Sequence, residues 1–239
     1  MPESYTINME NKHSGSSELK LLSATSLKLI AAASMLVDHI GAVLFPGYKW
    51  LRIVGRIAMP IFCFCIAESL RHTRNRAGFM LRIAVFALIS EYPFDIALKG
   101  QFSLKNTQNV MFTFLFAIAG IWAFEYVKER AGSLAGGLAA CLAAVMLAAA
   151  ADMLKTDYGT FGVTLVYLFY FLRPDMPLRL GAAALYITAA RWKKLQLYCL
   201  LAFPIIALYN GERGKDLKYF FYIFYPGHLL ILYLIKILT

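Results

Sequence analysis

Residues 133–151 read SLAGGLAACLAAVMLAAAA, a stretch without a charged side chain. A helix that rises 1.5 Å per residue needs roughly 20 apolar residues to cross a hydrocarbon core of about 30 Å. This stretch is therefore expected to be a membrane-spanning helix.

Similar apolar runs recur along the whole chain, with short polar islands between them. Their number predicts an all-α, polytopic transmembrane helix bundle of about nine spans, within a range of roughly 8–10. The runs cover residues 27–45, 53–70, 79–98, 109–127, 133–151, 159–172, 178–190, 195–209 and 218–238. The sixth, seventh and eighth runs are shorter than the others. They are open to three interpretations: tilted spans, re-entrant segments, or two true spans divided into three.

The bulk composition also favours lipid as the solvent. Apolar residues make up 60% of the 239 residues, charged residues 16%, and the mean hydropathy is +0.60. The polar islands are too short to form a separate soluble domain, so residues 27–239 are expected to be a single transmembrane domain. Residues 1–26 are polar and lack periodicity, which predicts a disordered tail. The tail lacks the apolar core and cleavage site of a signal peptide, so the first span is expected to direct insertion.

The placement of lysine and arginine predicts the orientation in the membrane, because positively charged loops resist translocation. A cytoplasmic N-terminus places more of these residues inside than outside. The inner set is Lys12, Lys20, Arg71, Arg74, Arg76, Lys128, Arg130, Arg173, Arg179, Arg213, Lys215 and Lys218, and the outer set is Lys49, Arg52, Lys99, Lys105, Lys155, Arg191, Lys193 and Lys194. The same bias accounts for the formal charge of +10, so no nucleic-acid partner is expected.

Several motifs of other protein classes are absent from the sequence. It has no Walker loop, His-Glu-x-x-His or Gly-x-Ser-x-Gly, which argues against ATP-driven pumping and the common hydrolase chemistries. Cys63 and Cys65 lie two residues apart, on nearly opposite sides of a helix. A shared metal site is therefore not expected, and we predict no bound metal.

The informative residues are the ionisable ones inside the apolar runs, because lipid excludes them unless they have a partner or a wet cavity. Asp38 and His39 are neighbours in the first run and point about 100° apart, so each needs a different partner. Arg56 in the second run is the natural partner of Asp38. His39 is then held by Glu91 or Asp95, or points into a substrate cavity. As a neutral imidazole it suits a general base, although a plain hydrogen bond between helices explains it equally well.

Glu91 and Asp95 lie four residues apart and share one helix face. They could orient His39, bind a cation or share a proton. For Asp95, a solvated place at the outer interface is an equally good interpretation. His228 follows a proline and a glycine in the last run, a setting that either presents an imidazole to a cavity or allows a hydrogen bond between helices.

Arg74 and Arg76 belong to a basic segment that follows the second run. Arginines there could grip the phosphates of an acyl-coenzyme A. The positive-inside rule explains the segment at least as well.

Several blocks of the sequence together resemble the TraX family, named for the F-pilin acetylation protein. The first and most specific pair is Met35-Leu36-Val37-Asp38-His39-Ile40-Gly41 followed by Gly55-Arg56-Ile57-Ala58-Met59-Pro60. Later blocks are Arg74-Asn75-Arg76, Glu91-Tyr92-Pro93-Phe94-Asp95, Asn109-Val110, Asp157-Tyr158-Gly159, Tyr209-Asn210-Gly211 and Phe224-Tyr225-Pro226-Gly227-His228.

The resemblance implies a multi-pass inner-membrane protein that transfers an acetyl group from acetyl-coenzyme A. It implies His39 as the catalytic base, supported by Asp38 and Arg56, with His228 as the second catalytic candidate. The implied substrate-binding and donor-binding residues are Glu91, Asp95, Asn109, Arg74, Arg76 and Tyr158, with Arg56 or Asn109 supporting the oxyanion. The compact Glu-Tyr-Pro-Phe-Asp and Asn-Gly motifs resemble members outside conjugation systems, so the acceptor is either a pilin amine or a glycan or small molecule of the envelope.

Two other classes of function remain open at the level of sequence. One is a proton-coupled transporter or exporter that relays protons through Asp38, His39, Glu91 and His228. The other is a membrane assembly factor without catalytic activity. Binding of acetyl-coenzyme A is expected of an acetyltransferase and of neither of these two alternatives.

Overall fold

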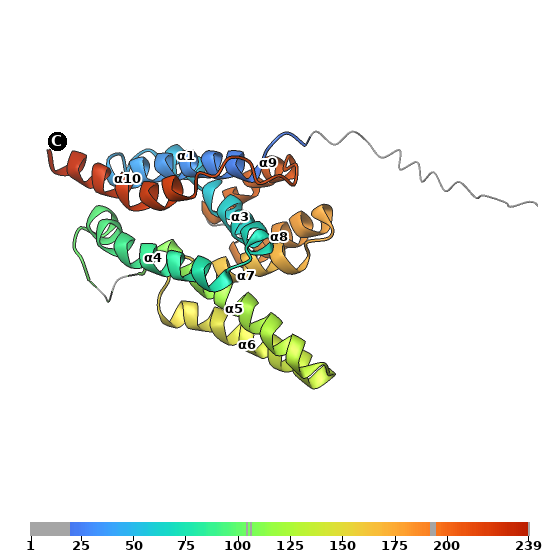
Figure 1. Ribbon diagram of the computed structural model, residues 1–239. Helices are drawn as coiled ribbons and strands as arrows, with labels where there is room; N and C mark the ends of the chain where they lie inside the picture. Colours follow the sequence, from blue (N-terminus) through green and yellow to red (C-terminus); the bar gives the residue numbers. More distant parts are fainter. Residues whose placement is uncertain (1–19, 104, 106, 192–194, 239) are drawn as a thin grey trace, which may run out of the picture.

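The computed structural model describes residues 20–103, 105, 107–191 and 195–238, and their regular structure is helical (Figure 1). Each apolar run of the sequence coincides with helix, so the all-α prediction is confirmed. The elements are α1 (Ala24–Val43), α2 (Lys49–Gly55), α3 (Ala58–His72), α4 (Arg76–Leu98), α5 (Val110–Ala131), α6 (Leu134–Met153), α7 (Gly159–Phe171), α8 (Met176–Arg191), the 3₁₀ helix η1 (Leu195–Ala202), α9 (Phe203–Ala207) and α10 (Lys218–Leu238).

Helix α1 begins earlier than the sequence predicted. Disorder was expected up to residue 26, but the helix starts at Ala24 because Ser23 caps it, its side chain accepting a hydrogen bond from the backbone N–H of Ser26. Residues 1–19 of the predicted tail lie outside the described residues.

The first turn of α1 is tied to the segment that precedes α10. The backbone N–H groups of Ala24 and Thr25 donate to the carbonyl oxygens of Glu212 and Arg213, at 2.8 and 3.1 Å. These N–H groups have no partner inside their own helix, so the distant carbonyls satisfy them. Helices α1 and α10 therefore begin at the same end of the bundle and run side by side (Figure 1).

The second apolar run is divided into two helices. Helix α2 ends at Gly55, and α3 starts at Ala58 after a turn at Arg56. Helix α2 packs closely on α1, because a Cβ at Gly55 would overlap the side chain of Asp38 and a Cβ at Gly41 would come within 2.7 Å of the Leu51 Cβ. This close approach places Arg56 beside Asp38.

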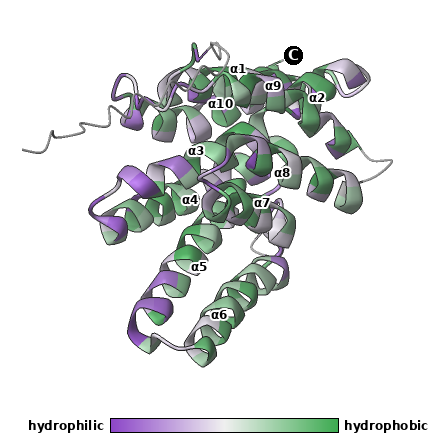
Figure 2. Ribbon diagram, turned by 90° about the vertical axis from the view of Figure 1, so that its right-hand side faces the viewer, coloured by the Kyte–Doolittle hydropathy of each residue, from purple (hydrophilic) through white to green (hydrophobic). Residues whose placement is uncertain are grey.

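The helices form layers that are visible in Figure 1: α1 and α10 lie together, α4 lies below them, and the α5–α6 hairpin extends away from the rest. Gly132 permits the turn of that hairpin by adopting a φ of +50°. Figure 2 shows that the helices are hydrophobic along most of their length and hydrophilic mainly near their ends. This distribution is the one that a bilayer requires.

The outer face of α6 is apolar and uncovered. Leu138, Leu142 and Met146 are 65, 60 and 62% exposed, a large hydrophobic surface for which lipid is the natural neighbour. Within the described residues, five segments are long and apolar enough to cross a membrane: Ala24–Val43, Lys49–His72, Val110–Ala131, Leu134–Met153 and Lys218–Leu238. The chain is thus a multi-pass membrane protein, and the figure of nine spans stays a prediction.

Candidate functional site

Two histidines that lie far apart in the sequence meet inside the bundle. His39 Nδ1 on α1 lies 2.7 Å from His228 Nε2 on α10. The ring planes differ by 12°, and the ring centroids are 5.0 Å apart. The structure therefore pairs the two histidines that the sequence singled out separately.

The second nitrogen of His228 determines where the protons sit. His228 Nδ1 lies 2.7 Å from the carbonyl oxygen of Phe224, one turn earlier in α10. A carbonyl oxygen only accepts, so Nδ1 carries a proton. When both rings are neutral, His228 Nε2 then accepts from His39 Nδ1. This arrangement leaves His39 Nε2 with a free lone pair, the state required of a general base.

Asp38 faces α2 rather than α10 and is enclosed by two guanidinium groups. Its carboxylate oxygens lie 2.5 and 2.6 Å from Arg56 Nη2 and 2.7 Å from Arg52 Nη1. Asp38 and Arg56 are both buried, at 6% exposure each. The predicted pairing of Asp38 with Arg56 is confirmed, and Arg52 joins it as an additional partner.

Each nitrogen of the Arg56 guanidinium has a hydrogen-bond partner, and Nη2 is the one that contacts Asp38. Its Nε donates to the carbonyl oxygen of Arg52 at 3.2 Å, and its Nη1 donates to the hydroxyl of Tyr158 at 3.3 Å. The structure thus brings Tyr158 to the Asp38 cluster. Because each of its nitrogens already has a partner, Arg56 is suited to positioning this cluster.

Glu91 and Asp95 have partners other than His39. Glu91 Oε2 accepts hydrogen bonds from the side-chain amide and the backbone N–H of Asn109, at 2.5 and 3.1 Å. Asp95 Oδ2 accepts from the backbone N–H of Ser103 at 2.8 Å. Asp95 is fully buried, so the expectation of a solvated place at the interface was wrong.

These contacts assign structural tasks to the polar ends of α4 and α5. The Asn109 side chain also accepts from the backbone N–H of Met111, which caps α5. Its amide group donates to Glu91 and to the carbonyl oxygen of Ala87, so no donor of the side chain is left over. Among the described residues, no group of three or more His, Cys, Asp and Glu side chains could hold a metal ion.

The basic segment after α3 lies apart from the histidine pair. Arg76 forms an ion pair with Glu125 of α5, and the same carboxylate accepts from the Tyr170 hydroxyl. Arg74 is exposed. The structure does not bring Arg74 or Arg76 into contact with His39 or His228.

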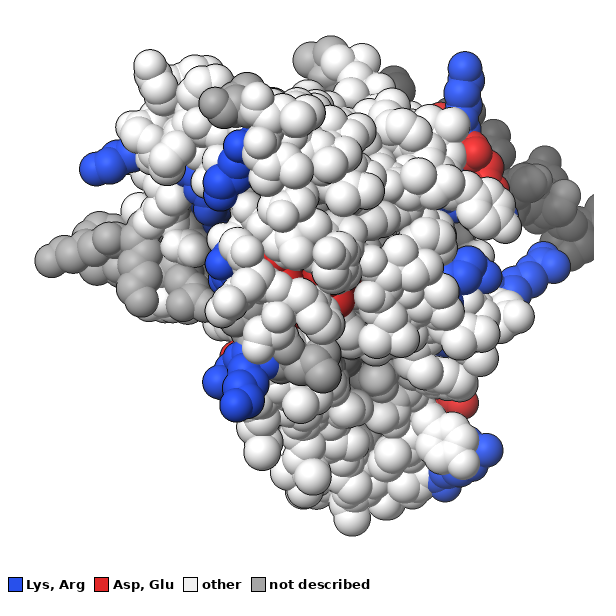
Figure 3. Space-filling model, turned by 90° about the vertical axis from the view of Figure 1, so that its left-hand side faces the viewer, with Lys and Arg blue, Asp and Glu red and all other residues white. Residues whose placement is uncertain are grey.

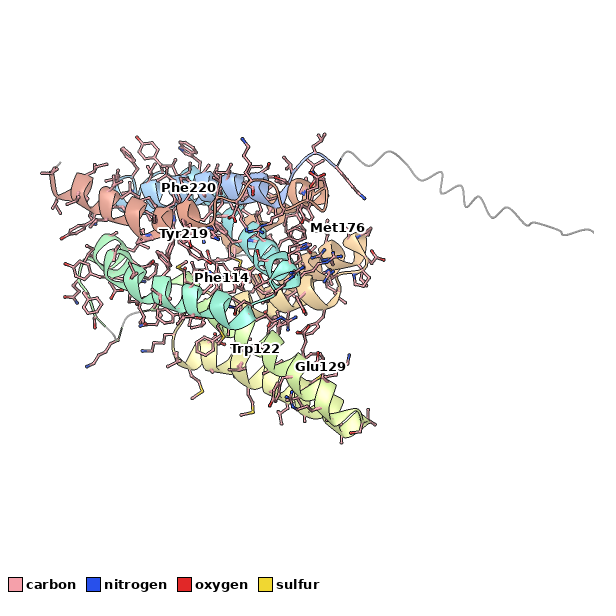
Figure 4. The ribbon with its side chains drawn as sticks, viewed as in Figure 1. Phe114, Trp122, Glu129, Met176, Tyr219 and Phe220 are labelled. Carbon is pink, nitrogen blue, oxygen red and sulfur yellow. The ribbon has the colours of Figure 1, made fainter. Side chains whose placement is uncertain are left out.

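A cavity of about 370 Å³ lies between α1, α3, α4, α5 and α10. Phe114, labelled in Figure 4, lines it from α5. Met35 and Phe224 also line it, and each lies four residues, one helical turn, before a histidine of the pair. Phe224 stacks on His228 with a centroid distance of 4.8 Å. Neither histidine of the pair lines the cavity, but Phe224, which does, packs directly against His228.

The opposite end of the molecule, where α1 and α4 finish, is seen in Figure 3. The view shows acidic side chains recessed between white surfaces and Lys or Arg side chains around them. Asp157 and Lys99 are exposed residues of the loops at this end. Charged groups therefore flank the bundle at both ends, as expected for a bilayer protein.

Three features of the site escaped the sequence analysis. Arg52 was counted only as an outer charge, although its spacing of four from Arg56 predicts a shared helix face. Arg82 lines the cavity. The buried pair of Glu68 and Arg179, at 2.7 Å, joins residues 111 positions apart, and no local pattern indicates it.

Comparisons with known proteins identify the family of the chain. Residues 23–236 match the family described as TraX protein. The chain is 29% identical over 245 residues to a probable fimbrial assembly protein FimC, serogroup H1, of Dichelobacter nodosus, an alignment that covers 88% of this chain and 94% of that protein. It is also 55% identical over 38 residues to an uncharacterized protein RP591 of Rickettsia prowazekii (strain Madrid E), 16% of this chain and 15% of that protein. No solved structure matches the chain. Because the family match spans nearly the whole transmembrane domain, the chain belongs to the TraX family.

Proposed function

We propose that the protein is an acetyltransferase of the inner membrane that moves an acetyl group from acetyl-coenzyme A to an amine or hydroxyl acceptor. The observation that carries the proposal is the hydrogen-bonded chain from the Phe224 carbonyl through His228 to His39. It leaves His39 Nε2 unprotonated and fixes the orientation of the ring, as a general base requires.

The proposed step is an acyl transfer with His39 as the base. The acceptor nitrogen or oxygen attacks the thioester carbonyl carbon, and His39 Nε2 takes the acceptor's proton. The carbon–sulfur bond then breaks, and the proton held by His39 passes to the departing thiolate. The products are the acetylated acceptor and coenzyme A, and His39 returns to its starting state.

We propose Arg52, rather than Arg56 or Asn109, as the group that supports the oxyanion of this step, because its side chain is the most exposed of the three. Its side chain is 31% exposed, whereas Arg56 is 7% exposed and has its donors engaged. Asn109, the other group considered from the sequence, also has its amide donors engaged. A guanidinium beside a developing negative charge stabilises the transition state more than the substrate. Asp38 and Arg56 then act as positioning residues.

The cavity supplies a route for the donor. Its lining is mostly apolar near Met35 and Phe224 and carries cationic side chains where α1, α4 and α10 begin. With the N-terminus of α1 at the cytoplasmic side, a cytoplasmic thioester enters there and its acetyl end reaches the histidine pair.

The acceptor is proposed to be a pilin amine or another component of the cell envelope. The support is the name of the Dichelobacter nodosus relative, which is described as a probable fimbrial assembly protein. Mass spectrometry of envelope proteins and glycans, from cells with and without the chain, identifies the acceptor by the loss of one acetyl group.

The direct test uses purified protein in nanodiscs with acetyl-coenzyme A and a panel of amine and hydroxyl acceptors. Release of coenzyme A is expected, and His39→Gln should reduce the rate by about 10²–10⁴-fold, the usual worth of a general base. The melting temperature of the variant provides the control for folding. Unchanged turnover in a folded His39→Gln variant would remove His39 from the mechanism. Transport driven by a pH gradient, without coenzyme A release, would support the proton-coupled transporter instead.

A further inference from the structure

The cavity has an excess of positive charge at one end. Lys28, Arg82, Arg213 and Lys218 line it, and Glu68 is the one carboxylate residue among its described lining residues. Glu68 is already paired with Arg179 at 2.7 Å. The cavity therefore presents cationic side chains to whatever enters it.

Two of these cations form no ion pair within the described part of the chain. Arg213 and Lys218 lie 3.1 and 3.8 Å from Asp216. No described carboxylate forms an ion pair with Arg82 or Lys28, and Lys28 Nζ donates to the neutral Ser69 hydroxyl at 3.4 Å. Asp216 is the carboxylate on which the charge of Lys28 acts from a greater distance. The positive charges of Lys28 and Arg82 thus have no ion-pair partner among the described residues.

Of the two residues, Arg82 gives the stronger argument for an anionic ligand. It lies in the second turn of α4, its Nε atom is buried, and no hydrogen-bond partner reaches that atom. Its described side-chain partner is Tyr222, which cannot balance a positive charge at neutral pH. Arg82 as a whole is half-buried, and a guanidinium without a counter-charge at the wall of a membrane-protein cavity is unfavourable. An anionic ligand in the cavity would remove this cost.

The geometry of the three helices brings the two cations to one place. Helices α1, α4 and α10 all begin at the same end of the bundle (Figure 1), and Lys28 and Arg82 lie in the second turns of α1 and α4. Both line the same cavity of about 370 Å³. Their charges consequently act on the same occupant.

We propose that Lys28 and Arg82 form a phosphate-binding site in this cavity, and that the phosphates belong to the coenzyme A donor. Guanidinium and ammonium groups are the usual protein ligands of phosphate. The inference rests on the proposed function for the identity of the donor. It replaces Arg74 and Arg76, which do not line the cavity, as the residues that hold the phosphates.

Binding to the full chain in nanodiscs of neutral phosphatidylcholine tests the site. Titration with coenzyme A should show that Arg82→Gln weakens binding by at least about tenfold, the loss expected for a hydrogen bond to a charged group. Lys28→Gln should weaken it by a smaller factor, and Arg82→Lys should retain part of the affinity because it keeps the charge. Pantetheine, which lacks the phosphates, should bind the wild type and Arg82→Gln equally.

Arg130→Gln is the matched control. Arg130 is an exposed arginine at the end of α5, where it stacks on Tyr126 at 3.6 Å from the ring centroid, and it does not line the cavity. Its replacement should leave coenzyme A affinity unchanged.

The outcomes separate this inference from the proposed function. If Arg82→Gln and Lys28→Gln bind coenzyme A as tightly as the wild type, the phosphate site is refuted while acetyl transfer stands. If the wild type fails to bind coenzyme A, nanodiscs that contain phosphatidylglycerol supply the other source of phosphate. Stabilisation of the wild type by that lipid, lost in Arg82→Gln, would support the anion site and refute the donor. If the wild type neither binds coenzyme A nor is stabilised by phosphatidylglycerol, the phosphate site is refuted.

Discussion

Arg56→Met should destabilise the protein strongly, because it leaves the buried carboxylate of Asp38 with Arg52 as its remaining ion-pair partner. Arg56 and Asp38 are each 6% exposed, and their shortest contact is 2.5 Å. Breaking a buried pair from one side costs about 3–5 kcal/mol of the free energy of unfolding. Because Arg52 still pairs with Asp38 at 2.7 Å, we expect the loss toward the lower end of this range. For a chain of this size, 1 kcal/mol corresponds to a shift of about 2–4 °C, so the melting temperature should fall by roughly 6–20 °C.

Thermal unfolding in detergent, followed by tryptophan fluorescence, measures the effect. Arg213→Met is the matched control, because Arg213 pairs with Asp216 at 3.1 Å on the surface, where the side chains are 67 and 49% exposed. An exposed pair is worth about 0–1 kcal/mol, so this control should shift the melting temperature by less than about 4 °C.

A double variant tests whether the cost comes from the pair itself. Asp38→Asn together with Arg56→Met should cost about 1–3 kcal/mol less than the sum of the two single variants. Each single variant leaves one buried charge without this partner, whereas the double variant removes both charges. Additive losses, or an Arg56→Met variant no less stable than Arg213→Met, would refute the interpretation of Asp38 and Arg56 as a coupled buried pair.

Two further predictions concern packing and burial, and both are checked by melting temperature. Gly55→Ala should lower it and reduce acetyl transfer, because the new Cβ overlaps the Asp38 side chain, whereas Gly137→Ala in α6 meets nothing within 4 Å and should leave it unchanged or slightly raised. Glu68→Leu should cost about 3–5 kcal/mol, because it leaves Arg179, 3% exposed, without its carboxylate; a loss below 1 kcal/mol would show that the pair is not coupled.

The sequence predicted the helices well because a bilayer imposes a simple rule on them. Each apolar run became helix, since lipid offers the backbone no other partner. The ends were less predictable: the division at Arg56 and the 3₁₀ helix η1 depend on packing, and the hydrophobic runs pass through both without a break.

For the site, the contact between residues close in the sequence was predicted, and the contact between distant residues was not. Asp38 on α1 and Arg56 in the turn after α2 are 18 residues apart, and charge alone suggested their pairing. His39 and His228 are 189 residues apart, so their contact depends on the way α10 packs on α1. The sequence left Glu91, Asp95 or a substrate cavity as the surroundings of His39. It did not indicate that Glu91 accepts hydrogen bonds from Asn109 and Asp95 from Ser103.

The tie between the start of α1 and residues 212–213 also has a consequence for biosynthesis. Helix α1 is made first, but the carbonyls that cap its first N–H groups and the histidine that pairs with His39 are made last. At about 5–20 residues per second, 189 residues take roughly 10–40 s to synthesise. During that time α1 lies in the membrane without its capping carbonyls, and the histidine pair forms only when α10 is inserted.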